Sequence, residues 1–202
     1  MRDPIYRFTI ITLSVLILLL EGCANSTPSR FYVLTSLAPL ENEKSIKAAN
    51  QELAIGVGPI ELPLYLDRLP ILTRTSQNEL QLSDLDLWAE PLEDNFSRVL
   101  AENLSLLIPT DRVVLSPSNR KMVVDLQVAV KVIQFDGQIG GDCTLSARWP
   151  IFGKNEKSIL LMKKSSFTER SVEPDHKAMV EALNKTLNGL SRDIASAIKG
   201  LQ

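Results

Sequence analysis

The sequence is poor in the side chains that enzymes most often use for acid–base and metal chemistry. It has a single histidine, His176, and two cysteines, Cys23 and Cys143, among 202 residues. No HExxH or paired-cysteine pattern surrounds them, so no metal site is indicated. A Ser-His-Asp site would need that one histidine, and no GxSxG turn is present. We therefore predict a protein that is not an enzyme and that binds no metal and no cofactor.

The charged residues give no sign of a catalytic or nucleic-acid site. Asp84, Asp86, Glu93 and Asp94 lie where helix caps and solvated surface are expected. His176 stands at the start of a predicted helix without a surrounding motif, and we expect it to be an exposed surface residue. The formal net charge is only −2, so no basic excess points to a nucleic acid.

The chain also lacks an apolar run long enough to cross a bilayer comfortably. Its longest run, from Phe8 to Leu20, is shorter than the roughly 20 residues of a spanning helix, and Arg2 and Arg7 precede it. A charged start followed by a short apolar stretch is typical of a secretory signal peptide. An uncleaved membrane anchor is the alternative interpretation.

The residues after this run resemble the bacterial lipobox. In Leu20-Glu21-Gly22-Cys23, leucine lies three residues before the cysteine and a small residue directly before it, although Glu21 departs from the pattern. The resemblance implies cleavage after Gly22, lipid on Cys23 and, because Ala24 replaces the aspartate of inner-membrane retention, transfer to the outer membrane. The predicted organisation is a signal peptide over 1–22, a lipidated cysteine and tether over 23–30, and a single periplasmic domain over 31–202.

Short alternating segments predict a β-sheet. The clearest is Met122 to Phe135, where apolar and polar residues alternate as in a long strand with one wet face. With the next two strands it predicts a three-stranded antiparallel meander. The predicted strands cover 31–34, 53–60, 71–74 with a hairpin partner at 80–82, 112–115, 122–135, 143–149 and 158–168.

Two segments show apolar residues at spacings of three and four, which predicts two helices. The first begins at Trp88, with Asp86 as its cap, and ends before Pro109. The second follows Pro174 and ends at Gly200. Each helix has one apolar face and needs a sheet to cover. The predicted fold is α/β or α+β, a choice left open: a mixed β-sheet packed by two long amphipathic helices.

Two further clusters are candidates for a site. Leu62, Pro63, Tyr65 and Leu66 form an apolar bend, and Trp88 precedes a helix. These five residues either seal one end of the core or form a contact surface for a partner or lipid. The glycines of the 136–141 segment lie between two strands, so they predict a hairpin turn rather than a phosphate-binding loop. Cys143 follows that turn, and we expect it to be a buried or half-buried small residue.

Four segments, in order along the chain, resemble the PqiC/YmbA family of auxiliary lipoproteins of ABC-type, MCE-linked transporters. Together they span most of the chain after Cys23. They are Phe31-Tyr32-Val33-Leu34 soon after the lipobox, Ile55 to Ile60 with Leu62, Pro63 and Tyr65 to Arg68, Trp88 to Leu92, and Phe135-Asp136-Gly137 with Gly140, Gly141, Leu145, Ala147 and Trp149.

This resemblance implies a non-catalytic lipoprotein on the periplasmic face of the outer membrane. It implies an MCE-domain protein of a lipid transport complex as the partner, a homo-oligomeric ring, and a role that supports membrane integrity. Only the lipid-bearing Cys23 carries over as a functional residue. The alternative is a stand-alone periplasmic lipoprotein that binds a lipid or another small ligand.

Overall fold

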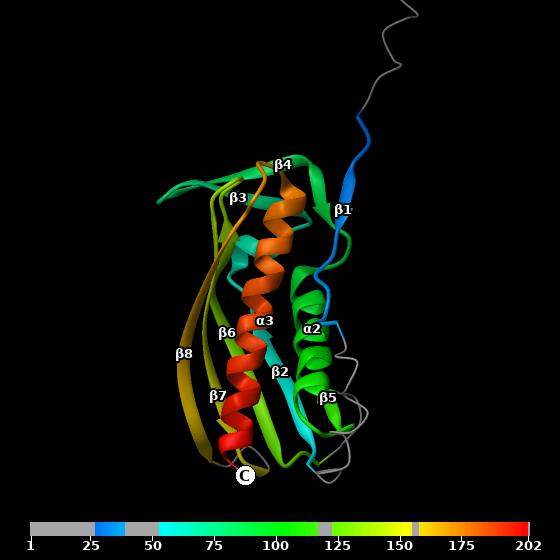
Figure 1. Cartoon of the computed structure of the whole chain (residues 1–202), viewed down its shortest axis with the longest axis vertical. Coiled ribbons are helices and arrows are strands. Elements are labelled where there is room, and N and C mark those ends of the chain that lie inside the picture. The colour runs from blue at the N-terminus through cyan, green and yellow to red at the C-terminus, as the bar shows by residue number, and fades with distance from the viewer. Residues whose placement is uncertain (1–26, 39–52, 117–122, 155–157, 202) are drawn as a thin grey trace, which may run out of the picture.

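A computed structural model describes residues 27–38, 53–116, 123–154 and 158–201. Helices separate groups of consecutive strands along this part of the chain (Figure 1). The predicted signal peptide and Cys23 lie outside the described residues. The elements are β1 (Arg30–Tyr32), β2 (Ile55–Glu61), the 3-10 helix η3 (Leu64–Leu66), β3 (Pro70–Ser76), β4 (Glu79–Trp88), α2 (Leu92–Leu107), β5 (Val113–Leu115), β6 (Leu126–Gly137), β7 (Asp142–Phe152), β8 (Ile159–Arg170) and α3 (His176–Gly200).

In the described residues the strands form one eight-stranded mixed sheet. Its main part runs β5, β2, β6, β7, β8: β2 pairs parallel with β5 and β6, and β6, β7 and β8 pair antiparallel in chain order. A smaller ribbon, made of β3, β4 and β1, joins the end of β6 through the single pair Thr73 and Gly137. The predicted mixed sheet is confirmed, and the ribbon is held to it by little backbone pairing.

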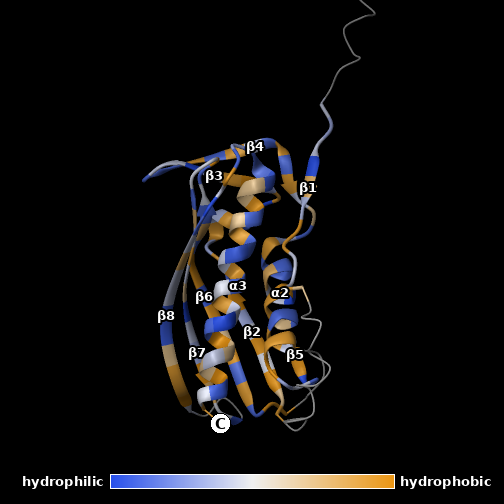
Figure 2. Cartoon of the chain, viewed as in Figure 1, coloured by the Kyte–Doolittle hydropathy of each residue, from blue (hydrophilic) through white to orange (hydrophobic). Residues whose placement is uncertain are grey.

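Both helices lie on the same face of the main sheet (Figure 1). α3 packs against β7 and β8, α2 packs against β2 and β5, and the helices contact each other. Figure 2 shows hydrophobic residues recurring along both helices and along β6 behind them. The two predicted helices are thus confirmed. The predicted apolar stripe of α3 is buried in the core: Val180, Leu183, Leu187, Leu190, Ile194 and Ile198.

The centre of the core lies between the helices and the main sheet. Trp149, Phe96 and Phe135 are each almost inaccessible to solvent. The Phe96 and Phe135 rings meet edge to face, with centroids 5.5 Å apart and an interplanar angle of 88°. The Trp149 Nε1 group donates to the Ser165 hydroxyl at 3.0 Å, so the one polar atom of this buried ring has a partner.

The boundary between β4 and α2 differs from the sequence-based prediction. Helical spacing placed a helix start at Trp88 with Asp86 as its cap, whereas β4 runs through Trp88 and α2 begins at Leu92. The Trp88 amide donates to the Leu69 carbonyl at 2.7 Å. That long-range bond keeps Trp88 in a strand, and local periodicity cannot reveal it.

The glycines between β6 and β7 form the predicted hairpin turn. Gly140 has φ 66°, a left-handed conformation that glycine adopts without strain. At Gly137, a Cβ atom would lie 2.8 Å from the Cα atom of Cys143 on the neighbouring strand. Only glycine fits that close approach. Cys143 itself is fully buried, as predicted.

None of the helices in the described ranges combines the length and the apolar character needed to cross a membrane.

Candidate functional site

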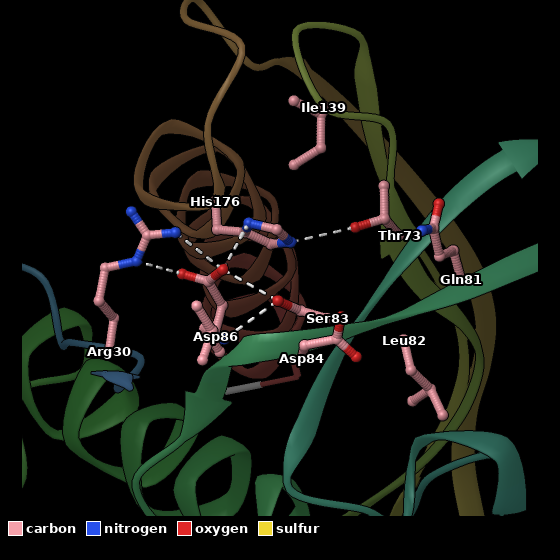
Figure 3. A pocket seen from close by; sticks show the side chains of 10 residues that line it. Arg30, Thr73, Gln81, Leu82, Ser83, Asp84, Asp86, Ile139 and His176 are labelled. Atoms are coloured by element: carbon pink, nitrogen blue, oxygen red, sulfur yellow. Dashed lines mark hydrogen bonds and ion pairs between the residues drawn. The ribbon is translucent and has the colours of Figure 1, made fainter. Parts of the chain in front are cut away.

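A cavity of about 330 Å³ opens between the small ribbon and the first turn of α3 (Figure 3). Its walls come from β1, β3, β4, the turn after β6 and α3. Most of the lining side chains are polar or charged, with Leu82, Leu85 and Ile139 as the apolar members. Figure 3 shows Arg30, Asp86 and His176 pointing toward one another at its edge.

Asp86 is the centre of this group, and it is only 3% exposed. Its carboxylate accepts hydrogen bonds from Arg30 Nε at 2.7 Å, Tyr32 Oη at 2.8 Å and Ser83 Oγ at 2.9 Å. Burial raises the pKa of Asp86, but these three hydrogen bonds outweigh burial and hold the pKa below its usual value. Asp86 is therefore an ionised carboxylate and not the solvated helix cap that the sequence predicted.

His176 completes the group from the start of α3. Its Nδ1 lies 3.0 Å from an Asp86 oxygen, and its Nε2 lies 3.4 Å from the Thr73 hydroxyl. The side chain is 19% exposed, so the prediction of an exposed surface residue was wrong. Burial lowers the pKa of His176 and the negative charge of Asp86 raises it; burial, with the repulsion of Arg30, is the stronger effect. His176 is therefore neutral at pH 7, with Nδ1 donating to Asp86.

Carboxylate, imidazole and hydroxyl follow one another here in the order of a hydrolytic triad, but the geometry favours a structural role. The Thr73 hydroxyl is farther from the imidazole than the 2.7–2.8 Å usual for a hydroxyl donor. Because Asp86 already forms an ion pair with Arg30, it stabilises a protonated His176 less strongly. Among the described residues, no group of three or more His, Cys, Asp or Glu side chains could hold a metal ion. The network ties β1 and β4 to α3.

A second buried carboxylate fastens the other side of the small ribbon. Asp136, on β6, is 1% exposed and accepts two hydrogen bonds from Arg74 of β3, at 2.7 and 2.8 Å. Tyr65 of η3 donates at 3.0 Å and Gln134 at 2.9 Å. Burial raises the pKa of Asp136, but these hydrogen bonds hold it below its usual value. Burial, together with the Asp136 charge, raises the pKa of Tyr65 to about 12.

Comparison with known proteins places this architecture in a family. Residues 32–195 match the model of the ABC-type transport auxiliary lipoprotein component, which is most of the chain. The chain belongs to this family of auxiliary lipoproteins. The resemblance inferred from the four segments is thereby confirmed, and the family is one of transport auxiliaries rather than of enzymes.

Two curated relatives of this auxiliary lipoprotein carry the name intermembrane transport lipoprotein PqiC, from Escherichia coli K12 and Shigella flexneri. Each is 22% identical over 182 residues, covering 90% of this chain and 93% of the relative. The crystal structure of protein XCC0632 from Xanthomonas campestris has a TM-score of 0.69 at 16% identity, covering 86% of this chain and 98% of that one. A second crystal structure, of an uncharacterized protein, has the same TM-score at 20% identity, covering 85% and 99%. These structures share the fold.

The structure separates the five residues that the sequence marked as either a seal of the core or a contact surface. Leu66 and Trp88 lie in the core, each 5% exposed, while Leu62, Pro63 and Tyr65 are half-buried. The most accessible side chain of that bend is Leu64, at 86% exposed. Any contact made there depends on Leu64 and its half-buried neighbours, since Leu66 and Trp88 face the interior. The contact itself stays a prediction.

The sequence predicted neither of the clusters centred on Asp86 and Asp136. Asp86 and His176 come from distant parts of the chain, as do Arg74 and Asp136, so no local spacing joins them. One signal was present: Asp136 directly follows the apolar alternation that ends at Phe135. A carboxylate at the end of a buried strand needs partners, which predicts an arginine or a tyrosine nearby.

The lowered pKa of His176 predicts a pH dependence of folding. Because the neutral imidazole is favoured in the folded state, the unfolded chain binds the proton more tightly. Stability is therefore lost as pH falls through 6.5, the ordinary pKa of histidine, toward the lower value of the folded state. We expect the free energy of unfolding to fall between pH 7.5 and 5.0, and His176→Gln to reduce that fall. Urea titrations at the two pH values measure it; an unchanged fall in the variant would contradict the assignment.

Proposed function

We propose that this auxiliary lipoprotein is anchored in the outer membrane through lipid on Cys23, faces the periplasm and docks an MCE-domain protein of an intermembrane lipid transport system. The family match over residues 32–195 is the observation that supports this most. The name of the curated relatives, intermembrane transport lipoprotein, agrees with it. In this proposal the chain is non-catalytic, assembles as a homo-oligomeric ring and supports membrane integrity.

A lipid anchor suits a docking role physically. Two or more acyl chains on one cysteine hold a protein stably at a membrane, whereas a single chain binds only marginally. Tethering also raises the effective concentration of the domain near a large partner at the same membrane, so a small interface suffices. Leu64, with the half-buried Leu62, Pro63 and Tyr65 around it, is the docking contact that we propose.

Co-purification tests the partner. Full-length, lipidated protein with a C-terminal affinity tag is cross-linked in its own cells and purified in mild detergent. We expect an MCE-domain protein among the captured chains. Native mass spectrometry of the same preparation distinguishes the alternative function, because a stand-alone carrier would be a monomer that retains lipid. If lipidated protein captures no MCE-domain protein, the docking role is contradicted.

A charged substitution tests the docking contact. Leu64→Asp places a carboxylate at the exposed tip of η3, and we expect it to weaken capture of the partner about tenfold, the size of a loss near 1.4 kcal/mol. Val172→Asp is the matched control, since Val172 is 84% exposed and lies outside that bend. Quantitative immunoblotting of the captured partner compares the two. Equal capture by both variants would place the contact elsewhere.

A further inference from the structure

At its β1 end, the small ribbon carries a row of apolar residues. Phe31 of β1 pairs with Leu87 of β4, and Leu87 pairs in turn with Pro70 of β3. Paired residues project to the same side of a sheet, so these three side chains form one row across three strands. Phe31 is 64% exposed, and Leu87 and Pro70 are half-buried. We call Phe31, Leu87 and Pro70 the ribbon row.

The ribbon row lies on the side of β1 and β4 that is turned away from the cavity. Arg30 and Tyr32, which flank Phe31, both donate to Asp86, which precedes Leu87. Because side chains alternate along a strand, Phe31 and Leu87 project to the opposite side. The Asp86 network thus fastens the opposite, cavity-facing side of the ribbon to the first turn of α3, and this leaves the apolar residues on the outward side.

The short stretch of chain between Cys23 and β1 limits how far this face can lie from the lipid-bearing residue. Arg30 is the seventh residue after Cys23, so even a fully extended chain places β1 within about 25 Å of the lipidated residue. The opposite end of the domain is much farther away, because the 25 residues of α3 lead from the ribbon to that end over about 37 Å. Figure 1 shows the ribbon and β1 at one end of the long axis, and the C-terminus at the other.

We propose that the ribbon row rests on the phospholipid surface of the membrane that holds the Cys23 lipid, so that the domain stands with α3 directed away from the bilayer. The inference rests on the lipid anchoring proposed above. A phenylalanine ring offers about 150–250 Å² of apolar area for burial at such a surface. The anchor makes the contact intramolecular, so a few apolar side chains suffice.

Site-specific fluorescence tests this orientation. Phe31→Cys and Ile159→Cys variants of the full-length, lipidated protein are labelled with an environment-sensitive dye and reconstituted in phosphatidylethanolamine–phosphatidylglycerol vesicles. Ile159 is the matched control, since it is 55% exposed and begins β8 at the far end (Figure 1). Cys143 is fully buried and does not take the label in the folded protein. We expect nitroxide-labelled lipids to quench the dye at position 31 at least threefold more than at position 159.

The outcomes separate this inference from the proposed function. Protein that floats with the vesicles but shows equal quenching at the two positions overturns the orientation and leaves the anchor intact. Protein that does not float overturns the anchor and this inference together. A change in dye emission at position 31 when an MCE-domain protein is added, without quenching by the labelled lipids, would assign the ribbon row to the partner and overturn the contact with lipid.

Discussion

Replacing Arg74 with alanine is expected to lower the free energy of unfolding by about 3 kcal/mol, near the lower end of the range for breaking a buried ion pair. The substitution leaves the carboxylate of Asp136, whose side chain is fully buried, without its bidentate partner. The Arg74 side chain is 23% exposed, so water partly replaces it and the loss stays near that lower end. Urea denaturation followed by the fluorescence of the buried Trp149 measures it.

A double-mutant cycle separates the pair from the packing of its two side chains. If Asp136→Ala is added to Arg74→Ala, the combined loss should be smaller than the sum of the single losses, because the second change removes the unpaired charge. The matched control is the surface pair Lys131 and Glu61, whose side chains are 72% and 60% exposed. Lys131→Ala should stay within about 0.5 kcal/mol of wild type. Strict additivity for Arg74 and Asp136 would contradict the coupling.

The reason for expecting so large an effect lies in the topology. The ribbon of β3, β4 and β1 joins the main sheet through one residue pair, Thr73 and Gly137. Its orientation therefore depends on side chains: Asp86 ties β1 and β4 to α3, and Asp136 ties β3 and η3 to β6. Removing either carboxylate should loosen the ribbon before the main sheet unfolds. Hydrogen exchange would then show faster exchange in β3 and β4 than in β6 and β7.

The parts of the fold that the sequence predicted are those with a long, regular pattern. The part of the predicted 122–135 strand from Leu126 onward became β6, and the apolar spacing after Pro174 became α3, because many residues contribute to each pattern. Met122 lies outside the described residues. The parts that it did not predict depend on single long-range contacts. Trp88 stays in β4 because its amide bonds to Leu69, and His176 is half-buried because Asp86 lies beside it.

The same distinction holds for the candidate site. The Leu62 to Leu66 bend is visible in the sequence as a run of apolar residues around Pro63, but which of them is exposed depends on packing against the sheet. Leu66 turns into the core and Leu64 away from it. The ribbon row is a stronger example. Phe31, Leu87 and Pro70 become neighbours only when β1, β4 and β3 pair, so their common face exists only in the folded chain.

Replacing Cys23 with alanine, in a chain whose residues 1–22 are exchanged for a leader that is cleaved without lipidation, is expected to move the protein from the membrane fraction to the soluble fraction. The anchor proposed here is the lipid on that sulfur, and none of the described helices can span a bilayer in its place. Fractionation followed by immunoblotting measures the shift. Cys143→Ala serves as the control: Cys143 is buried inside the domain, so this variant should remain in the membrane fraction. If the Cys23→Ala protein stayed with the membrane, another attachment would have to hold it.

Because the chain has two cysteines, a count of reactive thiols shows whether Cys23 carries lipid. The Cys143 thiol has no exposed surface, and burial raises its pKa to about 11, so the folded protein should not react there with maleimide at pH 7. A lipidated Cys23 has no free thiol. Processed wild-type protein should thus react at no position when folded and at one position after unfolding in detergent and urea. A chain whose Cys23 was left unmodified should react at one position when folded and at two after unfolding, which would contradict the proposed anchor.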